Sequence, residues 1–383
     1  MNTHNTHLVV AFLFTSVMQA ADIHVGPQHT ITDPQTALAV AADGDRLFLE
    51  PGTYPGGMEI TKGISFLPAQ EGTRFTFTGT VTLGGGANGR TILLSGCRIL
   101  TGLILPTPFS SRTVLRIVDG RCEGFSQTVA QPYLRLELYR DTIGPQAIQM
   151  TSGEIVGCVQ LHNGASWGAI YSYGGSALPD DNFIIGNRFI LTSNTAVAAF
   201  NLDRPLHFEN NSVSGSSDML SLSGGSSTMP RCTVLNNTFY NSGAIELPMS
   251  LITTIETGSS TPPTVNLLVK NNARISNQPI GPLTTANLTY FMIASNNITA
   301  GTSAINLATG EPTNGSPLIN AGDPDPRYLD LDLSINDVGC YGGSNSRANF
   351  TTPMGSAVVG FMQAPRVVAQ GQPVQISAVG FDR

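Results

Sequence analysis

A short phrase built around asparagine returns along the second half of the chain. In each copy an apolar residue lies three places before an Asn and another lies two places after it. The steps between copies are 24, 26, 34 and 25 residues, and the aligned positions are Asn187, Asn211, Asn237, Asn271 and Asn296. A period of this length is typical of a solenoid and is too short for two helices. The repeat predicts stacked short β-strands that turn at a polar corner, where these Asn residues form a structural ladder.

Composition agrees with one large elongated domain. The chain has 383 residues, of which 41% are hydrophobic and 12% are charged, and disorder needs the opposite balance. The net charge is -7, and the only lysines are Lys62 and Lys270. Because no basic stripe is present to meet phosphates, we expect no nucleic-acid partner. An anionic polysaccharide would have to be held by local arginines.

The first 21 residues look like a secretory signal peptide. An apolar run from Leu8 to Met18 is too short to span a bilayer, and Ala20 and Ala21 are small residues near a cleavage point. We therefore expect a secreted or cell-surface protein. No later segment is apolar for long enough to cross a membrane, so we expect no membrane span.

Five cysteines are spread along the chain without a CxxC pair, at Cys97, Cys122, Cys158, Cys232 and Cys340. Five thiols cannot all pair within one chain. Cys97 falls in the same phase as the later Asn residues, which indicates a small buried side chain at the corner. A disulfide between stacked turns remains open, and we expect no cysteine metal site.

A helix is predicted just after the leader. Asp33 is an N-cap residue, Pro34 fits the first helical position, and the following alanines favour helix. A turn at 43–45, a strand at 46–49 and the sequence Pro-Gly-Thr-Tyr at 51–54 come next. A helix placed before a strand stack covers the first open rung.

Residues 36–54 resemble the N-terminal cap and first rung of right-handed parallel β-helix proteins of the pectin-lyase-like superfamily. The shared pattern is a short helix, an AxxGD turn, a strand and a PGxY element. Together with the Asn repeats, the resemblance covers residues 22–343. It implies an all-β fold, a right-handed parallel β-helix of about ten or eleven rungs with a short N-terminal capping α-helix. The resemblance implies little about chemistry, because one fold hosts many functions.

The C-terminal part has two further resemblances. Residues 316–343 resemble the closing segment of exported bacterial β-helix proteins, with departures at Asn320, Leu333 and Cys340. Residues 344–364 have the composition of a linker. Residues 365–383 resemble the opening strands of an immunoglobulin-like or PKD-type module. Such a module needs roughly 100 residues, so we expect a truncated one here.

Catalytic candidates come from what the superfamily resemblance implies. Its lyases combine carboxylates with an Arg or Lys base, and a glycoside hydrolase needs two or three carboxylates around the scissile bond. The alternative for the basic residues is a solvated outward side chain, and the alternative for the two adjacent Asp residues is an ordinary turn. The candidates are Arg188, Arg204, His207, Lys270, Asp180 and Asp181.

Two other clusters point to ligands. Trp167, Tyr171 and Tyr173 lie near the acids at 180–181 and suit sugar stacking, although a lone Trp covering a rung is the alternative. Five carboxylates within 15 residues suit a structural calcium ion, although Asp-Pro pairs also make ordinary turns. These five are Asp323, Asp325, Asp330, Asp332 and Asp337.

The leading functional hypothesis is a monomeric secreted or surface protein that binds a polysaccharide or a cell-surface component without a catalytic site. One alternative is a polysaccharide lyase or glycoside hydrolase, and another is a structural spacer in a multidomain surface protein. Convergence of an Arg or Lys with two or more carboxylates in one groove would favour the enzyme. No cofactor other than calcium is expected.

Overall fold

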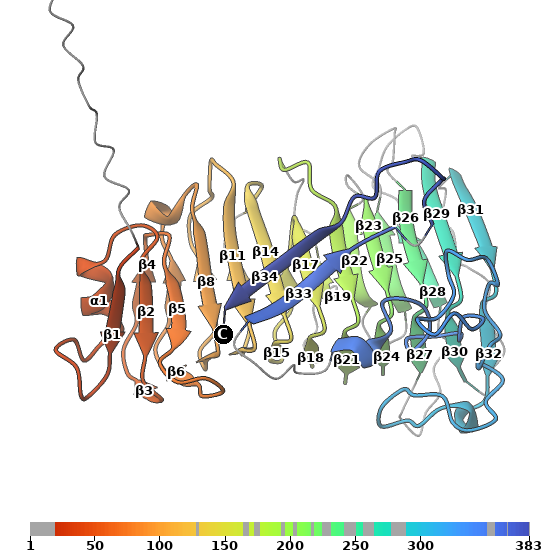
Figure 1. Ribbon diagram of the computed structural model, residues 1–383, viewed down its shortest axis with the longest axis horizontal. Coiled ribbons are helices and arrows are strands. Elements are labelled where there is room, and N and C mark those ends of the chain that lie inside the picture. The colour runs from red at the N-terminus through yellow and green to blue at the C-terminus, as the bar shows by residue number, and fades with distance from the viewer. Residues whose placement is uncertain are drawn as a thin grey trace, which may run out of the picture.

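The computed structural model describes residues 20–382 except 128–129, 164–167, 172–176, 193–195, 202–204, 216–217, 224–230, 241–249, 256–263, 277–288, 351–356 and 366. The described residues form long sheets of stacked parallel strands with one α-helix (Figure 1). This all-β arrangement is consistent with a parallel β-helix. Within the described part of the chain, no helix is long and apolar enough to span a membrane.

Two long parallel sheets run the length of the stack, and from its second strand onward each strand of the first sheet is followed along the chain by a strand of the second. Sheet A contains β1 (Asp22–Val25), β2 (Arg46–Leu49), β5 (Ser65–Pro68), β8 (Thr91–Ser95), β11 (Thr113–Val118), β14 (Leu134–Tyr139), β17 (Gly153–Val156), β20 (Asn182–Ile185), β23 (Leu206–Glu209), β26 (Arg231–Leu235), β29 (Thr264–Lys270) and β31 (Thr289–Ser295). Sheet B contains β3 (Gly52–Tyr54), β6 (Phe75–Phe77), β9 (Cys97–Ile99), β12 (Arg121–Cys122), β15 (Thr142–Ile143), β18 (Val159–His162), β21 (Arg188–Leu191), β24 (Ser212–Ser214), β27 (Thr238–Tyr240), β30 (Ala273–Ile275) and β32 (Ile298–Ala300).

Two shorter parallel sheets take the third position in the turns that run from β3 to β28. Sheet C contains β4 (Met58–Ile60), β7 (Val81–Leu83), β10 (Leu103–Leu105) and β13 (Phe125–Gln127). Sheet D contains β16 (Ile148–Gln149), β19 (Gly168–Tyr171), β22 (Ala196–Asn201), β25 (Asp218–Ser223) and β28 (Ser250–Ile255). Short 3₁₀ turns occur at η1 (Gly85–Ala87), η2 (Thr302–Ala304) and η3 (Arg347–Phe350).

Alternating side chains build the core. In β11 the side chains of Leu115 and Ile117 are buried, whereas Arg116 between them is partly exposed. Larger buried rings such as Phe189 and Phe208 stack between rungs with centroids 6.2 Å apart. One continuous apolar cluster reaches from the first rung to β29. The stack therefore has an inner apolar face and an outer face that is free to carry polar side chains.

The N-terminal helix forms as expected. Helix α1 (Pro34–Val40) begins after Asp33, whose carboxylate accepts from the Thr36 amide at 2.9 Å. At its other end Lys62 Nζ donates to the carbonyls of Leu38 and Ala41 at 2.7 and 2.6 Å. These bonds satisfy carbonyls that lack a partner within the helix and hold it on the first rungs.

An amide ladder follows the corner between sheets A and B, but two of its members differ from the prediction. Asn187, Asn211 and Asn237 are buried and bond to one another through side-chain amides at 2.9 and 3.1 Å. The ladder then continues through Asn272 and Asn297. The predicted members Asn271 and Asn296 instead have φ angles of 57° and 55° and make the left-handed turn. In each Asn-Asn pair the first residue turns the backbone, which Asn tolerates, and the second points inward.

The five cysteines are free and buried in the structure. Burial raises the pKa of Cys122 to about 12 and that of Cys232 to about 11. The thiols therefore stay protonated and serve as compact core side chains.

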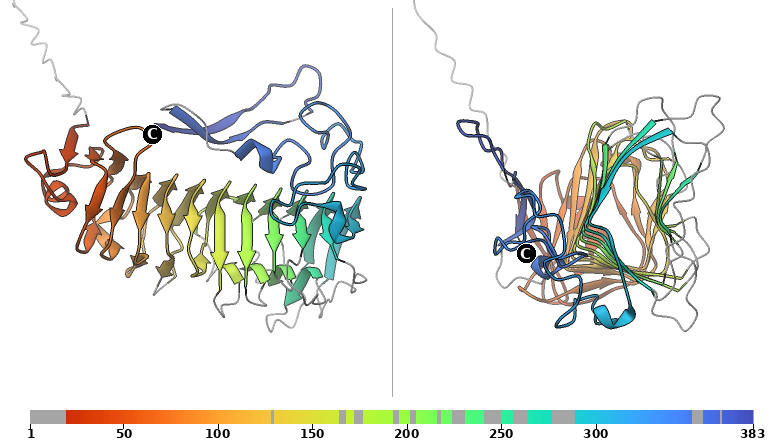
Figure 2. Two further views of the ribbon diagram at one scale, coloured as in Figure 1. Left: turned by 90° about the horizontal axis from the view of Figure 1, so that it is seen from below. Right: turned by 90° about the vertical axis from the view of Figure 1, so that its right-hand side faces the viewer.

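After β32 the chain returns along the outside of the stack. Residues 339–343 dock on the corner between sheets A and B, where the Gly339 amide donates to the Asn271 carbonyl at 2.9 Å. The segment predicted as a linker, residues 344–364, contains η3 and the whole of β33. Strands β33 (Ala357–Gln363) and β34 (Ser377–Asp382) form an antiparallel hairpin beside sheet A (Figure 2).

A small apolar cluster fixes this hairpin to the outer face of sheet A. Phe361 is 7% exposed and packs on a patch of Val118, Tyr139, Val156 and Ile185. Each patch residue comes from a successive rung, since the four pair in register across β11, β14, β17 and β20. The hairpin therefore covers an apolar stripe that the strand pattern leaves on the outer face.

We expect Phe361→Ala to release the hairpin while the stack stays folded, because the change removes its buried anchor at a cost of about 3 kcal/mol. Hydrogen exchange should show protection lost in β33 and β34 and kept in β14 and β20. Met362→Ala is the matched control, because Met362 is 57% exposed. Unchanged protection in the Phe361 variant would contradict this anchoring.

Candidate functional site

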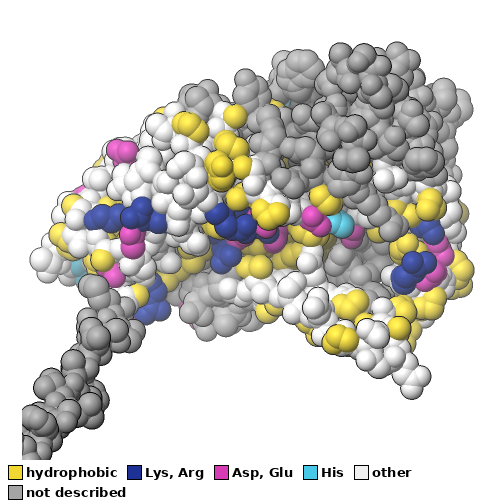
Figure 3. Space-filling model, turned by 90° about the horizontal axis from the view of Figure 1, so that it is seen from above, with side chains coloured by type: hydrophobic (Ala, Val, Ile, Leu, Met, Phe, Trp, Pro, Cys, Tyr) yellow, Lys and Arg dark blue, Asp and Glu magenta, His cyan; other side chains and the backbone are white. Residues whose placement is uncertain are grey.

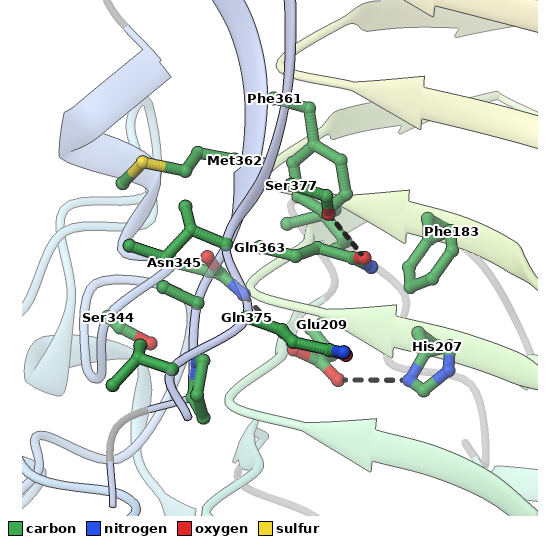
Figure 4. Close-up of a pocket in the computed structure, with 15 residues that line it drawn as sticks. Phe183, His207, Glu209, Ser344, Asn345, Phe361, Met362, Gln363, Gln375 and Ser377 are labelled. Carbon is green, nitrogen blue, oxygen red and sulfur yellow. Dashed lines mark hydrogen bonds and ion pairs between the residues drawn. The ribbon is translucent and has the colours of Figure 1, made fainter. Parts of the chain in front are cut away.

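A groove lies between the outer face of sheet A and the C-terminal segment (Figure 4). Its volume is about 760 Å³, within the range of small-molecule sites. Strands β20 and β23 form one wall, and residues 361–365 and 374–377 form the other, with 344–345 at one end. Its polar side chains are His207, Glu209, Ser344, Asn345, Gln363, Gln375 and Ser377.

Strand register brings the wall residues of sheet A together. Phe183 pairs with His207, and His207 pairs with Thr233 on the next strand. These residues alternate with buried ones, so all three side chains point outward. The rings of Phe183 and His207 stack with centroids 4.6 Å apart and planes 8° from parallel. Phe361 of the hairpin meets Phe183 at 5.6 Å, which closes the apolar side of the groove.

Hydrogen bonds engage both nitrogens of His207. Its Nε2 lies 3.3 Å from Asp181 Oδ2, and its Nδ1 lies 3.0 Å from Thr233 Oγ1. The Thr233 hydroxyl donates to Glu209 Oε1 at 3.0 Å, so its oxygen accepts from Nδ1–H. Nε2 faces the Asp181 carboxylate, which only accepts hydrogen bonds, so Nε2 also carries a proton. This chain of bonds fits the doubly protonated imidazolium.

The charges around His207 favour the same form. Burial lowers the pKa of His207, but the hydrogen bonds and negative charges of Glu209 and then Asp181 outweigh burial and raise the pKa above its usual range. Glu209 Oε1 is 3.6 Å from Nδ1, and Glu209 Oε2 also accepts from Asn345 Nδ2 at 3.2 Å. An imidazolium held in this way can donate a proton and is a poor base.

A second charged cluster lies on neighbouring rungs of the same face. Arg135 is bonded to Glu137 at 2.7 Å and to Glu154, and lies 3.6 Å from Asp180. The Tyr139 hydroxyl donates to Glu154 at 2.5 Å. The remaining pairs are Arg116 with Glu137 and Arg112 with Asp180, both at 2.6 Å. Figure 3 shows charged side chains running in a line along this face, with a histidine among acidic ones.

This second cluster is internally balanced. Arg135, Glu137 and Glu154 are almost completely buried, and each faces an opposite charge. Burial raises the pKa of Glu154, against the opposing effects of Tyr139 and Arg135. Removing one member would leave an unpaired buried charge, so the network is a structural element of the face.

The predicted acid pair is divided between these clusters. Asp180 bonds to Arg112 and lies near Arg135, whereas Asp181 bonds to His207. The structure therefore brings together His207 and Asp181 from the catalytic candidates, and adds Glu209.

The cationic candidates lie elsewhere. Lys270 at the end of β29 is bonded to Asp323 and lies 4.9 Å from the centre of the Tyr328 ring. Arg188 on sheet B donates to the Ala308 carbonyl of the returning chain. Arg204 lies outside the described residues. Neither described cation shares the groove with His207, because both bind the segment that closes the stack.

The aromatic candidates belong to another face. Tyr171 ends β19 on sheet D, and Trp167 and Tyr173 lie outside the described residues.

The acidic cluster near the C-terminal closing segment makes turns. Asp325 binds Arg327, and Asp332 accepts from the Ser334 amide at 3.0 Å. Asp330 accepts from the amides of Asp337 and Gly343, and Asp337 accepts from the Asn320 amide at 2.7 Å. Within the described ranges, no three His, Cys, Asp or Glu side chains come together as metal ligands. The carboxylates instead hold backbone amides and cations.

The repeat contained a signal for the site residues on sheet A, of which only His207 was predicted. If the phrases are aligned on the inward Asn, then Phe183, His207 and Thr233 all lie four places before it. Glu209 lies two places before Asn211, also on the outer face. Sheet register therefore makes these four side chains neighbours.

No protein-family model, curated protein or solved structure matches the chain.

Proposed function

We propose that the chain is an exported right-handed β-helix protein of the pectin-lyase-like type that binds carbohydrate in the groove under its C-terminal hairpin. The observation that carries this proposal is the lining of the groove. Apolar side chains of Phe183, Phe361 and Ile376 lie beside amide, hydroxyl and carboxylate groups. A sugar presents apolar C–H faces and hydroxyl edges, which suit such a mixed lining.

The hydrogen-bonding capacity of the groove supports the same conclusion. Gln375 is exposed and lines the groove from the hairpin side, opposite Glu209. In Figure 4 its amide is directed toward the Glu209 and His207 side. Side-chain amides donate and accept at once, as sugar hydroxyls do.

Calorimetric titration with a glycan panel tests this proposal, and we expect Gln375→Ala to weaken binding about fivefold, because one hydrogen bond contributes about 1 kcal/mol. Gln372→Ala is the matched control, since Gln372 is an exposed glutamine of the hairpin turn outside the groove. Equal affinities for both variants would place the ligand elsewhere. No binding to any glycan would leave the spacer function.

A glycoside hydrolase is the second candidate, and one observation favours it. His207 can donate a proton and lies between the carboxylates of Asp181 and Glu209. Release of reducing ends that Asp181→Asn abolishes would establish hydrolysis, and bound but uncut glycan would exclude it. A lyase has less support, because Lys270 and Arg188 bind the closing segment.

A further inference from the structure

The groove has an unusual charge balance for a carbohydrate site. Among its described lining residues the ionisable side chains are His207 and Glu209, and none is Lys or Arg. Asp181 adds a second carboxylate on Nε2 of His207. With His207 protonated, two negative charges face one positive charge. With His207 neutral, both negative charges are uncompensated.

The arginines that the structure describes on or beside the preceding rungs of sheet A do not correct this balance. Arg112, Arg116 and Arg135 are each bonded to Asp180, Glu137 or Glu154. A ligand carboxylate would have to displace one of these partners, and two of the three acids are buried. Breaking a buried ion pair costs more free energy than a new, exposed contact between the arginine and a ligand carboxylate would return.

A glycan bound in the groove would contact the charged side chains of Glu209 and His207 directly. The side chain of Glu209 is 16% exposed and that of His207 is 26% exposed, so both are partly shielded from solvent at the groove wall. Charges in such a position are screened less than charges on an open surface. A carboxylate placed beside Glu209 would therefore be repelled, whereas a hydroxyl could donate to it.

We propose that this groove selects uncharged glycans and rejects uronic-acid polymers. The proposal rests on the carbohydrate-binding function proposed above. Hydroxyl groups donate to Glu209 and exchange hydrogen bonds with Gln375, while Phe183 and Phe361 contact the apolar faces of the sugar. A uronic-acid oligomer of the same length would make the same contacts, but its carboxylates would also be repelled by Glu209.

The test compares a hexasaccharide of neutral hexoses with a hexasaccharide of hexuronic acids by calorimetric titration at low and high salt. We expect the uronate to bind at least about tenfold more weakly at low salt, with a smaller difference at high salt because salt screens the repulsion. In the double variant Asp181→Asn with Glu209→Gln, we expect the two affinities to come within about threefold.

The double variant Asp325→Asn with Asp332→Asn removes two negative charges outside the groove. We expect it to keep the full preference for the neutral hexasaccharide. The salt dependence of the unaltered protein is a separate readout that requires no variant to fold. Equal or tighter binding of the uronate by the unaltered protein would overturn the selectivity while leaving carbohydrate binding intact. If neither hexasaccharide binds, the proposed function itself fails.

Discussion

Replacing Asp141 by Asn should stabilise the protein by roughly 2–4 kcal/mol at pH 7, since each pKa unit corresponds to about 1.4 kcal/mol. Asp141 occupies the corner position that Asn residues hold in later rungs, and its Oδ1 accepts from the Gly120 amide at 2.7 Å. In the ladder, Asn187 likewise accepts from the Cys158 amide, and its Nδ2 donates to the Ile155 carbonyl.

Oδ2 of Asp141 takes the position that the donating Nδ2 has in Asn187. It is buried without a hydrogen-bond partner. Burial raises the pKa of Asp141 to about 8, against the opposing effect of the Gly120 amide. The folded protein therefore holds a proton that the unfolded chain releases near pH 4.

The sign of the pH dependence follows from this difference. Between about pH 4 and pH 8 the folded state binds more protons at this site, so the contribution of Asp141 to stability falls as pH rises. The Asn variant lacks this loss. Its advantage in the free energy of unfolding should be small at pH 4, grow up to about pH 8 and stay constant above.

Denaturant unfolding at pH 4, 6 and 8 measures this effect. Asp325→Asn is the control, because Asp325 is partly exposed and pairs with Arg327 at the surface, where an ion pair contributes little to stability. A destabilised Asp141→Asn variant, or an advantage that does not vary with pH, would contradict the account of this corner.

Replacing Asn211 by Ala should destabilise the protein by roughly 3–5 kcal/mol, because several buried polar groups lose their partners. Asn211 Oδ1 accepts from the backbone amide and the side-chain amide of Asn187 at 3.0 and 2.9 Å. Its Nδ2 donates to the Ile184 carbonyl and to Asn237 Oδ1 at 2.8 and 3.1 Å. None of these groups reaches water, since Ile184, Asn187, Asn211 and Asn237 are all fully buried.

The contrasting change is Asn296→Gly. Asn296 is exposed and has a φ of 55°, a conformation that Gly adopts without strain. We expect its replacement to change the free energy of unfolding by less than about 0.5 kcal/mol. Equal effects at the two positions would show that the ladder does not pass through the second Asn of each pair.

The repeat was sufficient to predict the strand stack and the corner, because both depend on local alternation and on turn residues. It did not distinguish Asn271 from Asn272, since an Asn-Asn pair offers two candidates for the inward position. Only backbone φ separates them. The capping helix was also predictable, because its N-cap and first-turn Pro are local signals.

The groove required information that no local pattern contains. One wall comes from residues 183–209 and the other from residues 344–377, which meet through tertiary packing of Phe361. The adjacent acids Asp180 and Asp181 looked like one pair in the sequence. Their separation depends on the positions of Arg135 and His207 on different rungs.

A crystal structure of the chain with a bound neutral hexasaccharide would show whether the groove beneath the hairpin holds the glycan. We expect sugar rings between strands β20 and β23 and the hairpin, in contact with Phe183, Glu209 and Gln375. A hexasaccharide bound instead on the outer face of sheet D, beside Tyr171, would contradict this expectation and assign recognition to the other side of the stack.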